Sequence, residues 1–546
     1  MRRFSWLLSC VLIALLRAFA QDAIAIRVDA ASKIAPVKPV WNFFGYDEPN
    51  YTYIEHGRKL IGEIALSSAS PAHFRTHNLL TSGDGTAALK WGSTNAYTED
   101  ANGKPVYDWT IVDRILKTYI QAGAKPFVEI GFMPKALSTQ PDPYVPVWRP
   151  GDKFDRYYVG WTYPPTDYAK WEELIFQWVK HSLKEYGRQE VASWDWEVWN
   201  EPDIGYWHGT PEEYDKLYDF TAAAVKRALP AARVGGPAST GPANAKAAAF
   251  LRQFLEHCAS GKNYVTGGTG APLDFIRFNA KGSPHLADGI VQMGLEHELN
   301  DVETGFQIVR SFPRFRHLPI VLSEADPEGC AACSARVYPQ NAYRNGTLYP
   351  AYTAAALKAT LTLADRYGVN LEGFLTWAFE FEGQPYFDGL RTLATNGLDK
   401  PVLNVFRMAG WLRGDYLKAV SMGTPNVDAL ATRAGRDLSV LVWNYQSDDV
   451  PGPAALVQLT IHGLPVEARR ILVRQYRIDD THSNAFTEWR RLGSPQTPSA
   501  DQYKSLEQAG QLQLLESPHF APVQSSTLQV KFSIPLQGIS LFALSW

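Results

Sequence analysis

The feature that most constrains the fold is a repeated alternation, from Lys38 to about Pro401, of short apolar runs and longer amphipathic segments. The short runs are rich in β-branched and aromatic residues, which favour strands, and the longer segments carry apolar residues at helical spacing. This alternation is typical of βα units around a parallel sheet. The predicted strands cover residues 40–45, 72–77, 125–131, 193–200, 233–236, 273–279, 319–324 and 371–378. The predicted helices include 109–122, 167–186, 211–228, 243–257 and 352–367.

Eight such units predict a (β/α)8 TIM barrel, an α/β fold. The alternative is an open doubly wound sheet, which would carry a glycine-rich phosphate-binding turn after its first strand. The sequence at that position, Phe-Phe-Gly-Tyr-Asp at 43–47, offers no such turn. We therefore expect residues 38–401 to form a catalytic barrel.

The residue pattern changes after residue 401, where helical spacing gives way to strand-like runs. Strand-like runs at 438–444, 455–461, 471–478 and 530–546 are separated by Pro, Gly and Asp, a pattern that predicts an accessory antiparallel β-sandwich over residues 402–546. Residues 24–28 also alternate, so the segment 21–37 is expected to add a strand to the sandwich. Trp443 and Tyr476 lie within apolar alternation and are expected to be core rather than a sugar-stacking platform.

The first twenty residues resemble a secretory signal peptide. Arg2 and Arg3 precede an apolar run over 4–16, and Ala-Phe-Ala at 18–20 fits a cleavage site. The alternative is a membrane anchor, but the run falls short of the roughly 20 residues that a span needs. We expect residues 1–20 to be removed and the protein to be secreted or periplasmic, with no membrane partner.

The net charge and the number of cysteines exclude some classes of partner and cofactor. Lys and Arg number 53 against 56 Asp and Glu, a net charge of −3, and no basic run argues for nucleic acid. In an oxidising compartment Cys330 and Cys333 are spaced for a short local disulfide, leaving Cys258 as a buried free thiol on a helix. These cysteines are too few for a metal knuckle, so no metal or cofactor is expected.

Two predicted strands end in carboxylates. Pro202 breaks the run at 193–200 just after Glu201, and period-two alternation places Glu197, Trp199 and Glu201 on one face. The apolar strand 319–324 ends in Glu324. The active sites of TIM barrels lie at the C-terminal ends of the strands, so Glu201 and Glu324 are expected to face each other, as the acid and nucleophile of a glycosidase do. Glu197 lies deeper and is expected to be a structural carboxylate.

Several longer stretches are similar to glycoside hydrolase family 39, a clan A family of retaining β-xylosidases and α-L-iduronidases. They are Trp-Asn-Glu-Pro at 199–202, Phe-Gly-Tyr-Asp-Glu-Pro-Asn at 44–50, Phe-Arg-Thr-His-Asn at 74–78, Ser-Glu-Ala-Asp-Pro-Glu-Gly-Cys at 323–330, Trp-Ala-Phe-Glu-Phe-Glu at 377–382, and Asp-Thr-His-Ser-Asn-Ala at 480–485 followed by Trp489. The resemblance spans nearly the whole chain after the signal.

The resemblance implies a retaining double displacement. Glu201 would be the general acid/base, Glu324 the nucleophile, and Asn200 the partner of the sugar 2-hydroxyl. Arg75 would orient the nucleophile, His77 would bind a ring hydroxyl, and Trp377 would form the floor under the sugar. The last three residues also have structural alternatives: an ion pair for Arg75, a satisfied histidine for His77 and barrel core for Trp377.

The sequence departs from the family pattern at Asn279, where the family more usually carries His, so we expect altered substrate contacts there. Nearby Arg277 or Lys281 offers a cation for a substrate carboxylate, as an iduronidase would need. The motif Glu-His-Glu at 296–298 superficially matches a zinc site, but no second His follows at helical spacing, so a surface turn is expected.

The preferred function is release of β-D-xylose from the non-reducing end of xylo-oligosaccharides. The stretches at 47–50 and 379–382 look most like those of bacterial β-xylosidases, and their acidic residues would repel a uronic acid. The alternatives are α-L-iduronidase or α-L-arabinosidase activity, or, from another class, a catalytically silent carbohydrate-binding or scaffold protein on the same fold.

Overall fold

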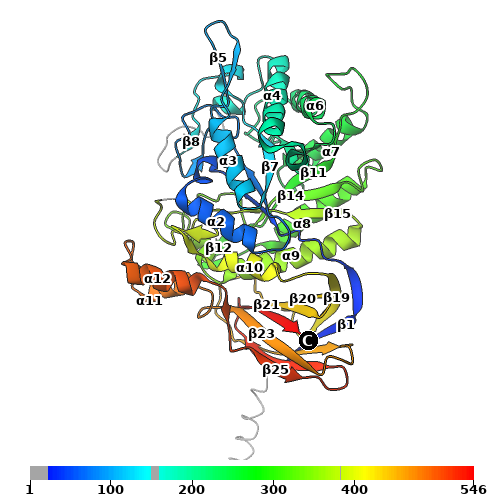
Figure 1. The fold of residues 1–546 in the computed structure, drawn as a ribbon, viewed down its shortest axis with the longest axis vertical. Coiled ribbons are helices and arrows are strands. Elements are labelled where there is room, and N and C mark those ends of the chain that lie inside the picture. Colours follow the sequence, from blue (N-terminus) through cyan, green and yellow to red (C-terminus); the bar gives the residue numbers. More distant parts are fainter. Residues whose placement is uncertain (1–22, 149–158, 382) are drawn as a thin grey trace, which may run out of the picture.

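The computed structural model describes residues 23–148, 159–381 and 383–546. The predicted signal segment at 1–20 lies outside these residues. Within them, none of the helices combines the length and the apolar character that crossing a bilayer requires. A barrel and a smaller β domain lie one above the other in Figure 1, with the two layers joined over a broad face.

The larger domain is a closed ring of parallel strands, so the TIM barrel prediction is confirmed (Figure 1). Each strand pairs with its neighbour in chain order, and the ring closes where Thr376 and Trp377 pair with Phe44 and Gly45. The strands are β2 (Phe43–Tyr46), β3 (His73–Thr76), β7 (Lys125–Ile130), β9 (Asp195–Val198), β10 (Arg233–Ser239), β11 (Phe275–Lys281), β14 (Pro319–Asp326), β15 (Asn370–Phe374) and β16 (Thr376–Trp377). The eighth strand, predicted as one run over 371–378, is thus split into β15 and β16 at Leu375.

Helices cover the outside of the ring. They are α2 (Glu55–Leu66), α3 (Thr110–Gln121), α4 (Tyr168–Tyr186), α5 (Arg188–Val191), α6 (Pro211–Ala228), α7 (Ala245–Ser260), α8 (Leu295–Arg310), α9 (Leu348–Tyr367) and α10 (Pro401–Ala409). The surface turn predicted at 296–298 is wrong, because these residues form the first turn of α8 and Glu298 is fully buried against Tyr352. The helix α10, which follows the predicted boundary at residue 401, also lies on the barrel, because Phe406 packs on Phe44 of β2.

The loops between the barrel strands and helices contain short paired strands and 3-10 helices. They are the paired strands β4 (Lys90–Trp91) and β8 (Val147–Trp148), β5 (Tyr97–Glu99) and β6 (Pro105–Tyr107), β12 (His285–Ala287) and β13 (Ile290–Gln292), and β17 (Ala394–Thr395) and β18 (Leu398–Asp399), with 3-10 turns at Pro49–Tyr51, Lys135–Leu137, Gly160–Thr162 and Pro339–Asn345. In the loop after β14, Cys330 and Cys333 form a disulfide, and Cys258 is a buried free thiol on α7, as predicted.

The barrel interior is built in layers. Phe43, Phe127, Phe275, Val321 and Leu375 form a buried apolar layer. Residues two positions further along a strand face the same side, so Glu129 follows Phe127 and Arg277 follows Phe275 toward the C-terminal end. The layer above the phenylalanines is therefore ionic, and the Arg277 guanidinium lies 4.1 Å from the Phe127 ring centroid.

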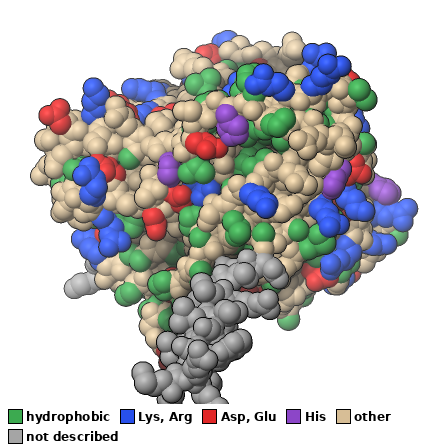
Figure 2. Space-filling view, turned by 90° about the horizontal axis from the view of Figure 1, so that it is seen from below, with side chains coloured by type: hydrophobic (Ala, Val, Ile, Leu, Met, Phe, Trp, Pro, Cys, Tyr) green, Lys and Arg blue, Asp and Glu red, His purple; other side chains and the backbone are tan. Residues whose placement is uncertain are grey.

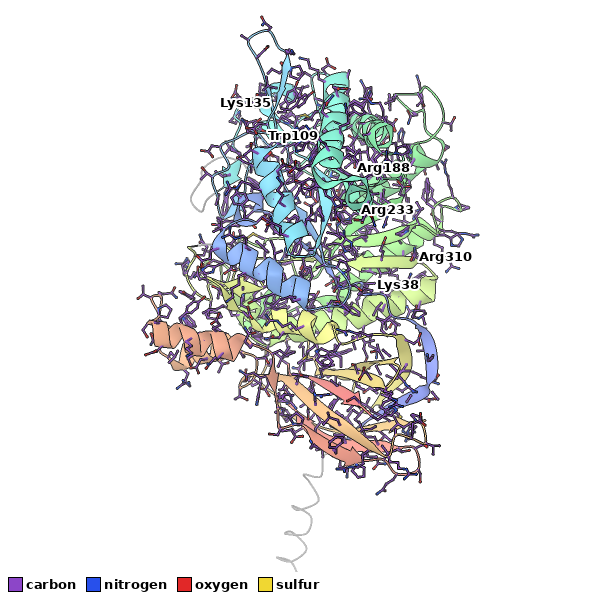
Figure 3. The ribbon with its side chains drawn as sticks, in the orientation of Figure 1. Lys38, Trp109, Lys135, Arg188, Arg233 and Arg310 are labelled. Atoms are coloured by element: carbon purple, nitrogen blue, oxygen red, sulfur yellow. A yellow bond between two sulfur atoms is a disulfide. The ribbon has the colours of Figure 1, made fainter. Side chains whose placement is uncertain are left out.

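Figure 3 shows which side of the barrel is the C-terminal one. Lys38, Arg188 and Arg233, which precede or begin strands, lie on one side, and Lys135, in the loop after β7, lies on the other. The C-terminal ends of the strands therefore face the side on which α11 (Ala485–Arg491) and α12 (Ala500–Gly510) project (Figure 1). The loop after β16 contacts this pair of helices, because the Phe387 ring lies 5.1 Å from that of Trp489.

The smaller domain is a mixed β-sandwich. Its strands are β1 (Ile24–Pro36), β19 (Asp415–Met422), β20 (Val427–Ala434), β21 (Asp437–Asn444), β22 (Ala455–His462), β23 (Arg470–Ile478), β24 (Gln513–Leu514), β25 (His519–Pro522), β26 (Leu528–Ile534) and β27 (Ile539–Ser545). The strand β1 pairs antiparallel with β19 and parallel with β22. The other strand pairings of this domain are antiparallel, as the sequence predicts, and β1 can pair parallel with β22 because it enters from the other end of the chain and needs no hairpin. The run predicted at 530–546 is two strands, β26 and β27, separated by residues 535–538.

The sandwich packs firmly on the barrel. Trp443 is 2% exposed, and with Leu441 and Leu541 it belongs to the same buried apolar cluster as the barrel helices, which confirms its predicted place in the core. Tyr476 is half-buried, and its ring centroid lies 5.7 Å from that of Trp411. On the sandwich end of the molecule, Figure 2 shows charged side chains of both signs interspersed with apolar ones.

Candidate active site

Glu201 follows β9 at the C-terminal mouth of the barrel. The strand ends at Val198, two residues before its predicted end, because Trp199 and Glu201 adopt left-handed backbone conformations with φ of 69° and 44°. The predicted alternation over Glu197, Trp199 and Glu201 is therefore wrong beyond Val198. The Glu201 amide instead donates to the Ala238 carbonyl of β10 at 2.9 Å, which fixes the acid to the neighbouring strand. Non-glycine residues hold such conformations only where the surroundings impose them, which often marks a functional site.

Glu324 lies near the C-terminal end of β14 and is buried. Its Oε2 is 2.7 Å from Lys281 Nζ of β11, and its Oε1 is 3.7 Å from Arg75 Nη1 of β3. Two cations from two other strands thus face this carboxylate.

The environment of Glu201 is different. It is half-buried, and its Oε1 accepts a 2.7 Å hydrogen bond from Asn279 Nδ2. Burial raises the pKa of Glu201 to about 8, and the negative charges of Glu324 and Asp203 add to the effect against the opposing Lys281 and Asn279. The two carboxylates at this mouth therefore have unequal environments: burial favours the protonated form of Glu201, and Glu324 lies against Lys281 and Arg75.

Arg75 organises the ionic layer below. Its Nη2 lies 2.8 Å from Glu129 Oε2 and 2.9 Å from Asn200 Oδ1, and its Nε lies 2.5 Å from Glu197 Oε2. Glu197 also pairs with Arg277 at 3.0 Å, which agrees with its predicted structural role. Burial opposes the charge of Arg75, but Glu197 and Glu129 outweigh it and hold the Arg75 pKa above its usual range.

His77 and Trp377 lie side by side at the mouth, with ring centroids 4.3 Å apart. The two ring nitrogens of His77 face Glu129 Oε2 at 2.6 Å and Asp47 Oδ1 at 3.4 Å. Burial and the charge of Arg75 lower the His77 pKa to about 3, so its imidazole is neutral. Burial works to raise the Asp47 pKa, but the charge of Lys90 and its hydrogen bond lower this pKa to about 2.

Trp377 is only 2% exposed, so it presents little more than an edge to a ligand. Its ring lies 4.9 Å from the Arg75 guanidinium carbon. Gly45 makes room for it, because a Cβ at that position would come within 2.3 Å of the indole. The structure therefore gives Trp377 a packing role beside Arg75 and His77 in addition to its place at the mouth.

Every site residue predicted from the sequence lies at the C-terminal ends of the barrel strands. Arg75, Asn279 and Lys281 each contact one of the two carboxylates, and Asn200 accepts a hydrogen bond from Arg75. Sequence reasoning missed three groups: Glu129, which bridges Arg75 and His77; Lys90, which neutralises Asp47; and Asp326, which binds Lys281. A signal existed for Glu129 alone, because it is a single carboxylate in an apolar strand, as Glu324 is.

With this geometry established, comparison with known proteins identifies the family. The sequence pattern described as "Glycosyl hydrolases family 39" matches residues 24–520. The chain belongs to glycosyl hydrolase family 39. It is therefore a glycoside hydrolase, and the resemblance seen in the sequence is confirmed.

The chain is similar both to β-xylosidases and to α-L-iduronidases. The chain is 30% identical to a β-xylosidase of Geobacillus stearothermophilus over 426 residues, 75% of each chain. It is 24% identical to an α-L-iduronidase of Mus musculus over 566 residues, covering 95% of this chain and 80% of the relative. Among solved structures, a monomeric β-xylosidase from Caulobacter crescentus CB15 superimposes with a TM-score of 0.75 at 23% identity, covering 96% of this chain and 99% of that one. This last likeness supports the fold.

Proposed function

We propose that this family 39 enzyme is a retaining exo-β-xylosidase in which Glu201 is the general acid/base and Glu324 the nucleophile. The observation that carries the proposal is the unequal environment of the two carboxylates. Burial raises the pKa of Glu201 to about 8, so the group holds a proton to donate, whereas Glu324 is 2.7 Å from Lys281 and available for attack. A retaining enzyme requires one carboxyl group in each state.

In the first step, a carboxylate oxygen of Glu324 forms a bond to the anomeric carbon of the sugar. The bond from that carbon to the leaving oxygen breaks, and Glu201 gives this oxygen its proton. Asn200, held by Arg75 at 2.9 Å, is placed to hydrogen-bond the 2-hydroxyl beside the nucleophile. Such a bond strengthens as positive charge develops on the sugar ring.

In the second step, the now ionised Glu201 takes a proton from a water molecule, whose oxygen bonds to the anomeric carbon as the bond to Glu324 breaks. Glu324 returns to its ion pairs with Lys281 and Arg75, and the sugar leaves with its original anomeric configuration. Both steps use only side chains of this protein and water.

Two observations support a neutral sugar over a uronic acid. Arg277 is fully buried against Glu197, and Lys281 is bound to Glu324 and Asp326, so protein carboxylates already occupy both candidate cations. The repulsion expected from the acidic stretch at 47–50 is a weaker argument in the structure, because Lys90 pairs with Asp47. β-Xylosidases among the relatives point the same way.

Release from a chain end is supported by the aromatic wall beside His77. The rings of Phe132 and Tyr206 lie 5.6 Å and 6.3 Å from the His77 ring, and Trp91 and Trp161 back them. All four aromatic residues are at most 5% exposed. A closed wall behind the sugar leaves no passage for a longer chain in that direction.

The experiment is a panel of aryl β-D-xyloside, α-L-arabinoside, β-D-glucoside and α-L-iduronide, compared by kcat/KM. We expect the xyloside to be preferred at least tenfold, with early release of β-xylose seen by proton NMR. Preference for the iduronide would overturn the substrate proposal, and early release of α-xylose would overturn the retaining mechanism.

We also propose that the enzyme is exported and that residues 1–20 are removed. The disulfide between Cys330 and Cys333 supports this, because disulfides persist mainly in oxidising compartments. Intact mass of protein recovered from periplasm or medium tests it. A chain that keeps residues 1–20 would contradict export by cleavage.

A further inference from the structure

Asp326 lies two residues beyond Glu324 on β14 and is 1% exposed. One of its contacts reaches the proposed nucleophile through a cation. Lys281 Nζ is 3.1 Å from Asp326 Oδ2 and 2.7 Å from Glu324 Oε2, so one ammonium group bridges the two carboxylates. The Lys281 side chain is 15% exposed and extends from the end of β11, where an ammonium on a flexible stem needs more than one partner to hold one place.

The other side of Asp326 holds the neighbouring strand. Its carboxylate oxygens accept 3.0 Å hydrogen bonds from the Trp377 amide, and its Oδ1 accepts another from Thr376 Oγ1. These two donors are the whole of β16, the short segment that closes the barrel ring. Asp326 thereby fixes the backbone that carries the Trp377 indole against Arg75, the second cation facing Glu324.

Asp326 belongs to a buried network of ion pairs that continues into the loop after β14. Arg391 Nη2 lies 3.8 Å from Asp326 Oδ2, while Arg391 Nη1 binds Glu328 at 2.9 Å and its Nε donates to the Trp377 carbonyl at 2.8 Å. Glu328 in turn pairs with Arg344 at 2.7 Å, and Arg344 donates to the carbonyl of Cys330 in the disulfide loop. Burial acts to raise the Asp326 pKa, but Arg391 and Lys281 outweigh it and lower this pKa.

We propose that Asp326 is a positioning residue for the reaction: it holds Lys281 on the nucleophile and Trp377 against Arg75, and so sets where Glu324 stands when it attacks. The inference rests on the proposed role of Glu324. It does not depend on which sugar is cleaved, because none of these contacts involves the substrate.

The test is a double-mutant cycle with Asp326→Asn and Lys281→Met, measured with whichever aryl glycoside the unaltered enzyme prefers. A misplacement of about 1 Å can cost on the order of 10²-fold in rate, so each single variant is expected to lose about 10²-fold in kcat with KM within about threefold. Because part of the effect of Asp326 passes through Lys281, the double variant should lose less than the product of the single losses.

Asp388→Asn is the matched control. Asp388 pairs with the exposed Arg336 at 2.6 Å in the same group of loops, and among the described residues its side chain pairs with no residue of the site, so the kcat of Asp388→Asn should stay within twofold. Independent losses that multiply in the double variant, or a kcat of Asp326→Asn within threefold of the unaltered enzyme, would overturn the proposal.

Two further readouts keep the proposal separate from folding and from the proposed activity. Asp326→Glu keeps the charge that Arg391 faces but moves it by one methylene, and it should lower kcat while the melting temperature changes little; an unchanged kcat contradicts positioning. A crystal structure of Asp326→Asn should show the Lys281 ammonium or the Trp377 indole displaced. If both stay in place, the proposal fails whatever the substrate panel shows.

Discussion

Replacing Glu201 with Gln removes the proton that the proposed first step needs, and the structure gives the size and pH range of the loss. A glutamate with its ordinary pKa of 4.5 is protonated in about one molecule in 300 at pH 7. With the pKa raised to about 8, chiefly by burial and then by Glu324, about nine molecules in ten carry the proton. The site therefore increases the competent fraction about 300-fold at pH 7.

We expect kcat/KM of the unaltered enzyme on xylobiose to fall as pH rises through about 8, because the acid loses its proton there. Glu201→Gln should lose about 10²–10⁴-fold on xylobiose and should no longer show that fall. A dinitrophenyl xyloside, whose leaving group departs without protonation, should lose much less in kcat/KM. The assay is kcat/KM against pH for both substrates and both enzymes.

Glu298→Gln is a control for the pH profile, because burial also raises the pKa of Glu298 to about 8, while this residue binds Tyr352 and is influenced by the charges of Asp326 and Lys281. It should keep both the activity and the fall near pH 8. If Glu298→Gln abolishes the fall, or if Glu201→Gln retains it, the assignment of the acid is refuted.

Three further predictions concern Glu324, the interface between the barrel and the sandwich, and His257. Glu324→Gln should abolish turnover of aryl xyloside by several orders of magnitude, since no covalent intermediate can form, and a variant with most of the activity would remove Glu324 from the mechanism. A chain ending at Gly410, after α10, should be insoluble because the barrel face covered by Trp443 and Leu541 is uncovered; a soluble, active fragment in a sedimentation and activity assay would contradict this. Burial opposes charging of His257, but its 2.9 Å bond to Asp219 outweighs burial and raises the His257 pKa. Urea titrations should therefore show that His257→Gln costs more free energy of unfolding at pH 6 than at pH 9. An equal cost at both pH values would contradict this.

The barrel was predictable because its signals are local and repeated. Each βα unit carries its own alternation, so small errors at the ends of strands leave the count of eight intact. Glu324 was placed by the same logic, since it ends a run of apolar residues. Glu201 was placed at the right end of its strand for a partly wrong reason: period-two alternation stops at Val198, and left-handed conformations at Trp199 and Glu201 redirect the chain.

The contacts between strands were not predictable from the sequence. Lys281 looked like a free cation for a substrate, because nothing in the order of residues shows that Glu324 and Asp326 of another strand lie within 3.1 Å of it. Likewise α11 and α12 were missed, because they interrupt a region whose surrounding pattern is that of strands. Pairing across a barrel is set by tertiary packing, which local propensity does not record.

The position of β1 has a consequence for the order of synthesis. Ile26 pairs with Ser421 and Leu459, so this strand is made before the barrel and its partners are made after it. At about 5–20 residues per second, β1 waits on the order of 20–80 s for the first of them. During that interval its backbone edge is unpaired, and the barrel face that the sandwich later covers is open to other chains. The accessory domain is therefore the last part of this enzyme to assemble, and its C-terminal strands end the period in which the new chain is most prone to aggregation.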